Sequence, residues 1–270
     1  MLKLRIITGL ILGTLLLLGV FLLPPLYAVL GFGVVFSIAA WEWAGFAGCK
    51  SAPVRVLYAA CIAIALYLGW RFSVERANFL LLLSIASFWW VIAFFWLTLA
   101  PARHRPPLTL LCGFLVLPPA FLALARLQVS SSGFAPGPQI LLFLVFLVTS
   151  ADIGAYFAGR SFGKRKLAPR VSPGKTWEGV AGGMAGVAAV AALGAEYFHL
   201  PLYPMVIFGV LVGIYSVIGD LTESMFKRAA GLKDSGTILP GHGGMLDRLD
   251  SVTAAAPLYA LGLFGSGVIR

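Results

Sequence analysis

The densest group of reactive side chains lies between residues 219 and 250. Asp220, Glu223 and Lys227 are spaced to share one face of a helix, and Asp247 and Asp250 are again three residues apart. Acids at a helix start also suit the helix dipole, but that does not explain five acids and four Lys or Arg residues within about thirty positions of so apolar a chain. Carboxylates from two helix ends can hold Mg2+ and leave positions open for phosphate oxygens. The segment therefore predicts a phosphoryl- or nucleotidyl-transfer site.

A second charged segment runs from Asp152 to Gly179. Asp152 lies near the end of a hydrophobic run, and an ionised carboxyl costs on the order of 3 kcal/mol at the bilayer centre and less near the interface, so we expect it to have a cationic partner. Six Lys or Arg residues and several glycines follow, a combination that suits phosphate. The alternative is a loop that only anchors the protein to anionic headgroups, which is the role we expect for Lys164, Arg165 and Lys166.

Two features of these segments have more than one interpretation. Gly174-Lys175-Thr176 looks like the end of a P-loop, but Pro169 stands where that motif needs glycine and no preceding strand is evident, so a P-loop is excluded. His242 lies between glycines in Pro240-Gly241-His242-Gly243-Gly244. It is either a packed or capping residue or a general acid/base in contact with a phosphate.

The composition indicates which elements must position these residues. Hydrophobic residues make up 60% of the 270 positions and charged residues 11%, whereas soluble domains have about 45–50% and about 25%. This excludes a soluble domain, a disordered chain and a disulfide scaffold, and it predicts an all-α polytopic membrane protein. Cys49, Cys61 and Cys112 are scattered in apolar context and predict neither a disulfide nor a zinc site. The predicted transmembrane helices number about nine: Ile6–Leu23, Leu26–Ala47, Val54–Trp70, Ala77–Leu99, Leu108–Ala125, Gln139–Gly159, Gly179–Phe198, Tyr203–Thr222 and Ser251–Ile269.

The basic residues predict the orientation of these spans. Of the 20 Lys and Arg residues, 16 fall at the N-terminus and on every second connection. The positive-inside rule then places the N-terminus and both charged segments in the cytoplasm and the C-terminus outside. The same rule accounts for the net charge of +10 without a nucleic-acid partner. The first run is long and lacks a cleavage site, so we expect a retained span rather than a signal peptide.

The chain divides by composition into two parts. Residues 1–138 form about five nearly pure hydrophobic spans, and residues 139–270 form a catalytic membrane domain of about four spans with two active loops, since eight of the ten acids lie at or after Asp152. Gly179-x3-Gly183 and Gly182-x3-Gly186 lie in the seventh run. Small residues at this spacing let helices approach closely, so we expect this span to pack inside the protein or at a dimer contact.

The charged segment between residues 219 and 250 resembles a family signature, that of the phosphatidate cytidylyltransferases, or CDP-diacylglycerol synthases. The residues that match are Ser224-x-Phe226-Lys227-Arg228-x4-Lys233-Asp234-x-Gly236-x2-Leu239-Pro240-x-His242-Gly243-Gly244-Met245-x-Asp247-Arg248-Leu249-Asp250. Upstream, Asp152-x-Gly154-Ala155-Tyr156-x2-Gly159 and Ser172-Pro173-x-Lys175-Thr176-x-Glu178-Gly179 are similar to the same family. The resemblance covers about Asp152 to Asp250, and the first five spans match only in hydrophobic character.

The resemblance implies a reaction in which CTP and phosphatidate give CDP-diacylglycerol and pyrophosphate, with Mg2+ and a second cation such as K+. It also implies a dimeric multi-span protein that contacts membrane lipid, here in a bacterial inner membrane because no transit-like N-terminus is present. We expect catalytic roles for Asp220, Asp247, His242 and Lys233. The expected metal ligands are Asp220, Asp247, Asp250 and Asp152. The expected contacts to CTP or phosphatidate are Ser172, Lys175, Thr176, Lys227, Arg228, Asp234, Gly243, Gly244 and Arg248.

Four other functions fit part of this pattern. A transporter fits charges within spans, but no repeat relates the two halves. A CDP-alcohol phosphatidyltransferase would carry an Asp-Gly-x2-Ala-Arg motif, which the sequence lacks. A lipid or polyprenol kinase that uses CTP would have similar charged loops. It would release CDP, whereas a cytidylyltransferase releases pyrophosphate. A structural membrane protein would not need this density of Asp, Lys and His.

Overall fold

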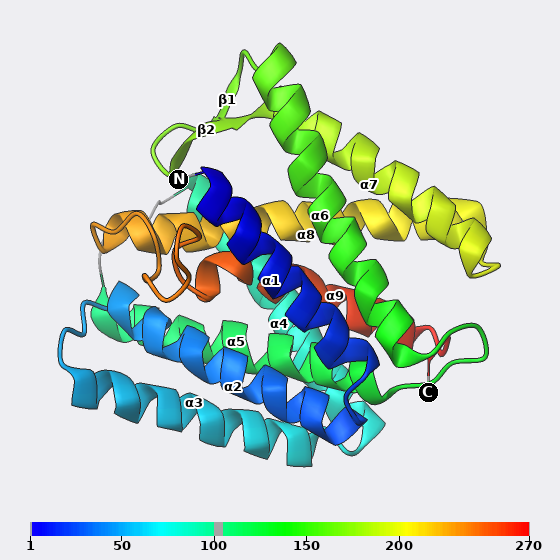
Figure 1. Cartoon of the computed structure of the whole chain (residues 1–270), viewed down its shortest axis with the longest axis horizontal. Coiled ribbons are helices and arrows are strands. Elements are labelled where there is room, and N and C mark those ends of the chain that lie inside the picture. Colours follow the sequence, from blue (N-terminus) through cyan, green and yellow to red (C-terminus); the bar gives the residue numbers. More distant parts are fainter. Residues whose placement is uncertain (1, 100–104, 270) are drawn as a thin grey trace.

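The computed structural model describes residues 2–99 and 105–269 and contains nine α-helices in that part of the chain (Figure 1). Each helix overlaps one of the nine predicted hydrophobic runs, so the all-α fold class is confirmed. Seven of them, α2 to α8, are long and apolar enough to cross a membrane, while α9 is shorter. The helices are α1 (Leu2–Phe21), α2 (Pro25–Phe46), α3 (Ala52–Phe72), α4 (Arg76–Leu99), α5 (Pro106–Val129), α6 (Gly137–Phe162), α7 (Trp177–Tyr197), α8 (Leu202–Ala229) and α9 (Asp250–Gly265).

Prolines mark several of the helix starts. Pro25, Pro53 and Pro106 occupy the first or second helical position of α2, α3 and α5. A proline is favoured there because its missing N–H would have no partner inside the helix and its fixed φ already suits helical backbone. The sequence therefore specifies where these spans begin, and the predicted runs agree with the helices to within a few residues at most ends.

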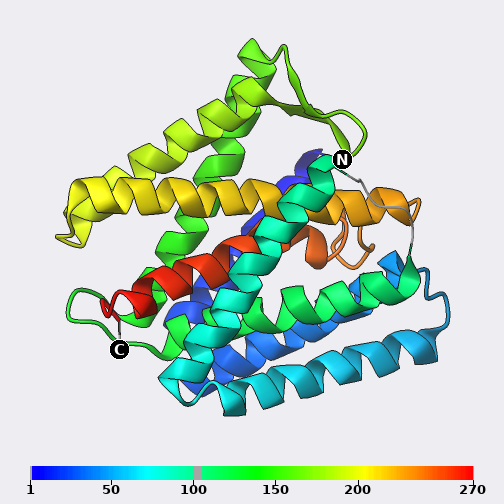
Figure 2. The same cartoon turned by 180° about the vertical axis from the view of Figure 1, so that it is seen from behind.

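The helices pack in two groups around a shared core. Helices α2, α3 and α5 lie side by side, and α6 and α7 form a close antiparallel pair across α8 (Figure 1). On the opposite face, α4 crosses α8 and α9 (Figure 2). One continuous cluster of buried apolar side chains links both groups, so residues on either side of position 138 contribute to the same core.

Successive helix connections alternate between two ends of the molecule. The N-terminus, the α2–α3 connection, the α6–α7 connection and the α8–α9 connection lie at one end, and the C-terminus lies at the other (Figures 1 and 2). This is the alternation on which the charge count depends. Of the residues in that count, Arg103 and Arg270 lie outside the described part of the chain, as do the side chains of Lys3 and Arg5.

The connection between α6 and α7 contains a feature that the sequence did not predict. Two short antiparallel strands, β1 (Lys166–Ala168) and β2 (Ser172–Thr176), form a hairpin. Its base is fixed by Glu178, whose carboxylate accepts hydrogen bonds from the backbone N–H groups of Lys164 at 3.0 Å and Arg165 at 3.2 Å. Strands of three and five residues that contain Lys, Ser, Pro and Gly lack the apolar alternation by which a strand is recognised.

Helices α6 and α7 approach each other through glycines. A Cβ atom on Gly183 would lie 2.7 Å from the carbonyl oxygen of Ala151, and one on Gly186 would lie 2.9 Å from that of Ser150. These separations are too short for any side chain. The predicted tight packing of the seventh span is therefore confirmed, and its partner is α6 of the same chain.

Candidate active site

The charged site lies where α8, α9, α6 and β2 meet, at the end of the molecule that holds the N-terminus. Gly219 on α8 packs directly on the first residue of α9, because a Cβ atom there would overlap the carbonyl oxygen of Asp250. This close approach places Asp220 next to Asp250, and their two carboxylates are near enough to repel each other. A glycine in α8 thus brings together two acids that are thirty positions apart in the chain.

Asp220 has the hairpin lysine as its cationic partner. The Lys175 ammonium on β2 forms an ion pair with Asp220, and the two side chains are 30% and 23% exposed. The Ser224 hydroxyl, one turn along α8, donates a hydrogen bond to the other Asp220 oxygen at 3.4 Å. Asp152 on α6 is within electrostatic range of Asp220, Lys175 and Arg248. The structure therefore brings together Asp152, Lys175 and Asp220, which the sequence analysis singled out in two separate charged segments.

Lys227 forms a second ion-pair group about two turns beyond Asp220 on α8. Its ammonium lies 3.1 Å from Glu223 Oε1 and 2.7 Å from Asp247 Oδ1. All three side chains are nearly buried, with exposed fractions of 10%, 4% and 8%. A buried charge left without its partner costs about 3–5 kcal/mol, so each member of this group depends on the others.

Asp247 orients the turn between α8 and α9. It belongs to the 3-10 turn η1 (Leu246–Arg248), and its Oδ2 accepts hydrogen bonds from the Ser235 N–H and hydroxyl, both at 2.9 Å, and from the Gly244 N–H at 2.8 Å. Partial burial alone would raise the pKa of Asp247, but the hydrogen bonds from Lys227, Gly244 and Ser235 outweigh it and hold this pKa below its ordinary value. With Oδ2 anchored in this way, Oδ1 points toward positive charge.

A buried acid from the first half of the chain completes the site. Glu42 on α2 is 2% exposed, and its carboxylate accepts hydrogen bonds from the N–H groups of Met245 at 3.0 Å and Leu246 at 2.8 Å and from the Ser235 hydroxyl at 3.1 Å. Side chains at Gly236 or Gly244 would overlap this carboxylate. Glu42 is not among the site residues predicted from the sequence. A lone acid inside a hydrophobic run is nevertheless a signal of a functional or buried polar site.

His242 lies beside the N-terminal helix. Gly241 and Gly243 on either side of it have φ values of +79°, a left-handed conformation that glycine adopts readily. Its Nδ1 is buried and has no hydrogen-bond partner among the described residues, and a Cβ atom on Gly9 of α1 would lie 3.7 Å from its Nε2. The adjacent Pro240 carbonyl accepts a hydrogen bond from the Thr8 hydroxyl at 3.1 Å. A general acid/base role for His242 stays a prediction.

Several residues that are predicted to contact substrate form hydrogen bonds with the backbone of the protein itself. The Thr176 hydroxyl caps α7 by accepting a hydrogen bond from the Gly179 N–H at 3.1 Å. Arg228 donates hydrogen bonds to the carbonyls of Val171 and Leu232, both at 3.4 Å. The remaining predicted residues are Ser172, which pairs with Ala168 in the hairpin, and Lys233 and Asp234, which are exposed on the α8–α9 connection. Substrate contact by these residues stays a prediction.

The donor set of this site suits a hard divalent cation. Within residues 2–99 and 105–269, no three His, Cys, Asp or Glu side chains are already spaced as a metal site. The Asp220 carboxylate nevertheless repels those of Asp152 and Asp250, and the Lys227 ammonium lies beside Asp247 Oδ1. Oxygen ligands of this kind are those that Mg2+ prefers, so the residues fit the predicted ion.

The fold and the site together define a polytopic membrane protein with a carboxylate-rich, ion-paired centre at one end of its helices. The chain belongs to the cytidylyltransferase family, whose model matches residues 3–264. The phosphatidate cytidylyltransferase of Pseudomonas aeruginosa is 44% identical over 277 residues, covering 99% of this chain and 98% of that protein. The phosphatidate cytidylyltransferase of Haemophilus influenzae is 38% identical over 282 residues, covering 96% and 98%. The family resemblance noted in the sequence is thereby confirmed.

Proposed function

We propose that this protein is a phosphatidate cytidylyltransferase that condenses CTP with phosphatidate to give CDP-diacylglycerol and pyrophosphate. The observation that carries the proposal is the full-length similarity to two proteins of that name. The site agrees with it, because ion-paired Lys side chains and converging carboxylates at one end of membrane helices suit a reaction between two phosphate groups, one of them on a lipid.

In the proposed reaction a phosphate oxygen of phosphatidate attacks the α-phosphorus of CTP. The new bond joins that oxygen to the α-phosphorus, and the bond between the α-phosphorus and the oxygen bridging to the β-phosphorus breaks, so pyrophosphate leaves. Phosphatidate is already anionic near neutral pH, so no strong base and no covalent enzyme intermediate are required. The protein must hold two anions in line and offset their repulsion.

The described residues can both hold the two anions in line and offset their repulsion. Lys175 and Lys227 present ammonium groups at the two ends of the carboxylate cluster, and Arg248 lies within electrostatic range of Asp152. The Glu42 and Asp247 carboxylates accept hydrogen bonds from the backbone N–H groups of the Gly244–Leu246 turn and so fix that backbone. Arg248 follows directly on that turn, so its guanidinium starts from a fixed backbone position.

We propose that Asp220, Asp247, Asp250 and Asp152 hold Mg2+, with a second cation such as K+ at the paired acids. When bound there, Mg2+ would supply positive charge that neutralises the triphosphate and the pyrophosphate leaving group. Three hydrogen bonds hold Asp247 Oδ2, and Oδ1 is paired with the Lys227 ammonium, so Asp247 would exchange that ammonium for the ion through Oδ1. Asp220 would exchange the Lys175 ammonium for the metal ion, which would free that ammonium for a phosphate.

We further propose that the site faces the cytoplasm of a bacterial cell from its inner membrane. CTP is a cytosolic substrate, and the end of the molecule with the site also holds the N-terminus and the basic connections (Figure 1). A reporter fused after Arg270 should read outside the cytoplasm. The resemblance also leads us to propose a homodimer, which size-exclusion chromatography with light scattering in detergent would test.

The direct test of the activity uses purified protein, phosphatidate and CTP labelled at the α-phosphate. We expect the label in a CDP-lipid and one pyrophosphate released per CDP-lipid formed. A CTP-dependent lipid kinase would instead leave the label in free CDP and phosphorylate a lipid. That result, or the absence of labelled lipid with Mg2+ present, would contradict the proposal.

A further inference from the structure

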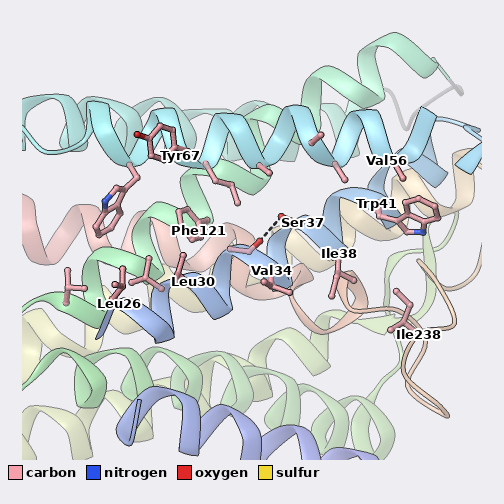
Figure 3. Close-up of a pocket in the computed structure, with 18 residues that line it drawn as sticks. Leu26, Leu30, Val34, Ser37, Ile38, Trp41, Val56, Tyr67, Phe121 and Ile238 are labelled. Atoms are coloured by element: carbon pink, nitrogen blue, oxygen red, sulfur yellow. Dashed lines mark hydrogen bonds between the residues drawn. The ribbon is translucent and has the colours of Figure 1, made fainter. Parts of the chain in front are cut away.

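An elongated apolar groove runs between α2 and α3, with Phe121 of α5 at its floor (Figure 3). Its volume is about 1150 Å³. Small residues keep it open, namely Gly33 on α2 and Ala60 and Ala63 on α3. Ligand pockets of proteins usually measure about 300–1,000 Å³, so this groove has room for an elongated apolar ligand.

One end of the groove adjoins the charged site. Trp41, Val56 and Ile238 line that end, whereas Leu26 and Tyr67 line the other (Figure 3). Ile238 belongs to the same α8–α9 connection that carries the site residues, so the groove and the site share a segment of chain.

The separation between the groove and the site is short. Trp41 is the neighbour of Glu42, and Ile238 is three residues from Ser235, whose hydroxyl contacts both Glu42 and Asp247. Three residues of fully extended chain span at most about 11 Å. A ligand lying in the groove therefore has one end within about that distance of the site.

A cation stands at this end of the groove. The Arg55 guanidinium lies 5.8 Å from the ring centroid of Trp41, and its Nε donates a hydrogen bond to the Cys49 carbonyl at 2.6 Å. Within the described residues its two terminal nitrogens make no hydrogen bond. A guanidinium with unpaired terminal nitrogens suits a phosphate group, and the groove that Trp41 lines beside it suits hydrocarbon.

The groove is long enough to span one leaflet of a membrane. Leu26 and Trp41 are fifteen residues apart on α2, which corresponds to about 22 Å of helix. Half of the hydrocarbon core of a bilayer is about 15 Å thick. A lipid tail that extends from the headgroup level to the bilayer centre therefore fits lengthwise.

We propose that this groove binds an acyl chain of the phosphatidate substrate and that Arg55 holds its phosphate beside the site as the lipid enters from the bilayer. The inference rests on the proposed function, because it assigns the groove to the lipid of that reaction. Bulk membrane lipid and a helix from a second copy of the chain are the other occupants that the test distinguishes.

The test fills the groove and varies the acyl chain. Ala60→Trp places a large side chain in the groove, and Cys61→Trp is the matched control because Cys61 is exposed on α3 and does not line it. We expect Ala60→Trp to lower kcat/KM about tenfold for a long-chain phosphatidate, since two or so methylenes lose their contacts. For dihexanoyl phosphatidate in the same micelles kcat/KM should stay within about twofold, and Cys61→Trp should change neither value.

The outcomes separate the alternatives. Equal losses for long and short chains, or no loss with either, would overturn the proposal, and the second result would leave the groove to bulk lipid. A change from dimer to monomer in Ala60→Trp would overturn it in favour of a second copy. If Ala60→Trp fails to fold, Ala63→Leu replaces it.

Crosslinking tests the groove without turnover. A phosphatidate with a photoreactive group at the end of one acyl chain, added without CTP, should label peptides of α2 and α3 in the wild-type protein. Labelling elsewhere would overturn the proposal. Wild-type protein that forms no CDP-lipid from either substrate would instead contradict the proposed function, while this labelling would still test the groove.

Discussion

The first five helices and the last four contribute differently to the site. Helices α6 to α9 and their connections carry all of the predicted reactive residues, including the ion pairs of Lys175 and Lys227. Helices α1 to α5 look like plain hydrophobic spans in the sequence, yet α2 contributes Glu42 and, with α3, the apolar groove. In this membrane protein the half rich in charge carries the residues proposed to act in the reaction, and the half poor in charge positions a turn of the site and borders it.

A single polar residue in an apolar span can contribute more to the positioning of the site than several charged residues in an exposed loop. Glu42 makes three hydrogen bonds to the α8–α9 connection from within α2. Lys164, Arg165 and Lys166, by contrast, are exposed. A buried polar group that loses its hydrogen bond has no water to replace the partner, so each buried contact affects stability strongly. Exposed charges are screened by solvent and salt.

The largest effect is expected from Asp247→Asn in the charged half. This change removes a carboxylate charge from the cluster and weakens the buried pair with Lys227, so activity should fall about a hundredfold or more. The measurement is CDP-lipid formation at ordinary Mg2+, with size-exclusion chromatography in detergent to show that the variant is folded. Near-normal turnover that still requires Mg2+ would place the ion elsewhere.

The next largest loss of activity is expected from Glu42→Gln on α2, in the apolar half. In either orientation the new amide NH2 would face a backbone N–H, of Met245 or of Leu246, and a buried group left unsatisfied costs about 1–3 kcal/mol. We expect kcat to fall about tenfold or more. Glu75→Gln is the control, because Glu75 is the other acid of the first half, is exposed and contacts Asn78. Equal activity of the two variants would show that α2 does not position the site.

Lysine variants compare two parts of the α6–α7 connection. Lys175→Ala removes the partner of Asp220 and a predicted phosphate contact, a loss of about 1.5–3 kcal/mol or roughly ten- to a hundredfold in rate. Lys164→Ala should leave the rate nearly unchanged, because its side chain is exposed. Rates measured with saturating and limiting CTP would show the difference. The reverse order of effects would mean that the site is misassigned.

Gly183→Leu should change the reaction rate least of these variants. It should clearly lower the thermal stability of the protein. The new side chain would meet the Ala151 carbonyl and separate α6 from α7, at a cost of about 1–3 kcal/mol. Thermal unfolding in detergent should shift to lower temperature. Gly13→Leu serves as control, since no atom lies within 4 Å of a Cβ at that position. An unchanged melting temperature for Gly183→Leu would contradict the role of this contact.

The sequence predicts the helices well because hydrophobic length and proline are local signals. Pro25 and Pro106 begin helices that the runs already indicated. The runs fail where polar residues continue a helix. Helix α8 extends to Ala229, seven residues beyond its predicted end, so Lys227 and Arg228 lie on helix and face fixed partners.

The site is predicted in composition but not in its pairings. Spacing indicates that Asp220, Glu223 and Lys227 share a face, and the structure confirms this through the contact between Glu223 and Lys227. Spacing does not indicate that Lys175 reaches Asp220 or that Glu42 reaches Leu246, because these pairs depend on how distant helices pack. Local patterns contain no information on such contacts.

The bond between Glu42 and the η1 turn also bears on how the protein can be divided. A fragment that begins at α6 would keep every reactive side chain discussed above but lose the acceptor of the Met245 and Leu246 N–H groups. Those groups would be left unpaired in surroundings that offer little water, at about 1–3 kcal/mol each. The reactive half therefore depends on its hydrophobic companion for correct backbone geometry, and a shortened enzyme made of the last four helices would need a new acceptor built in at this turn.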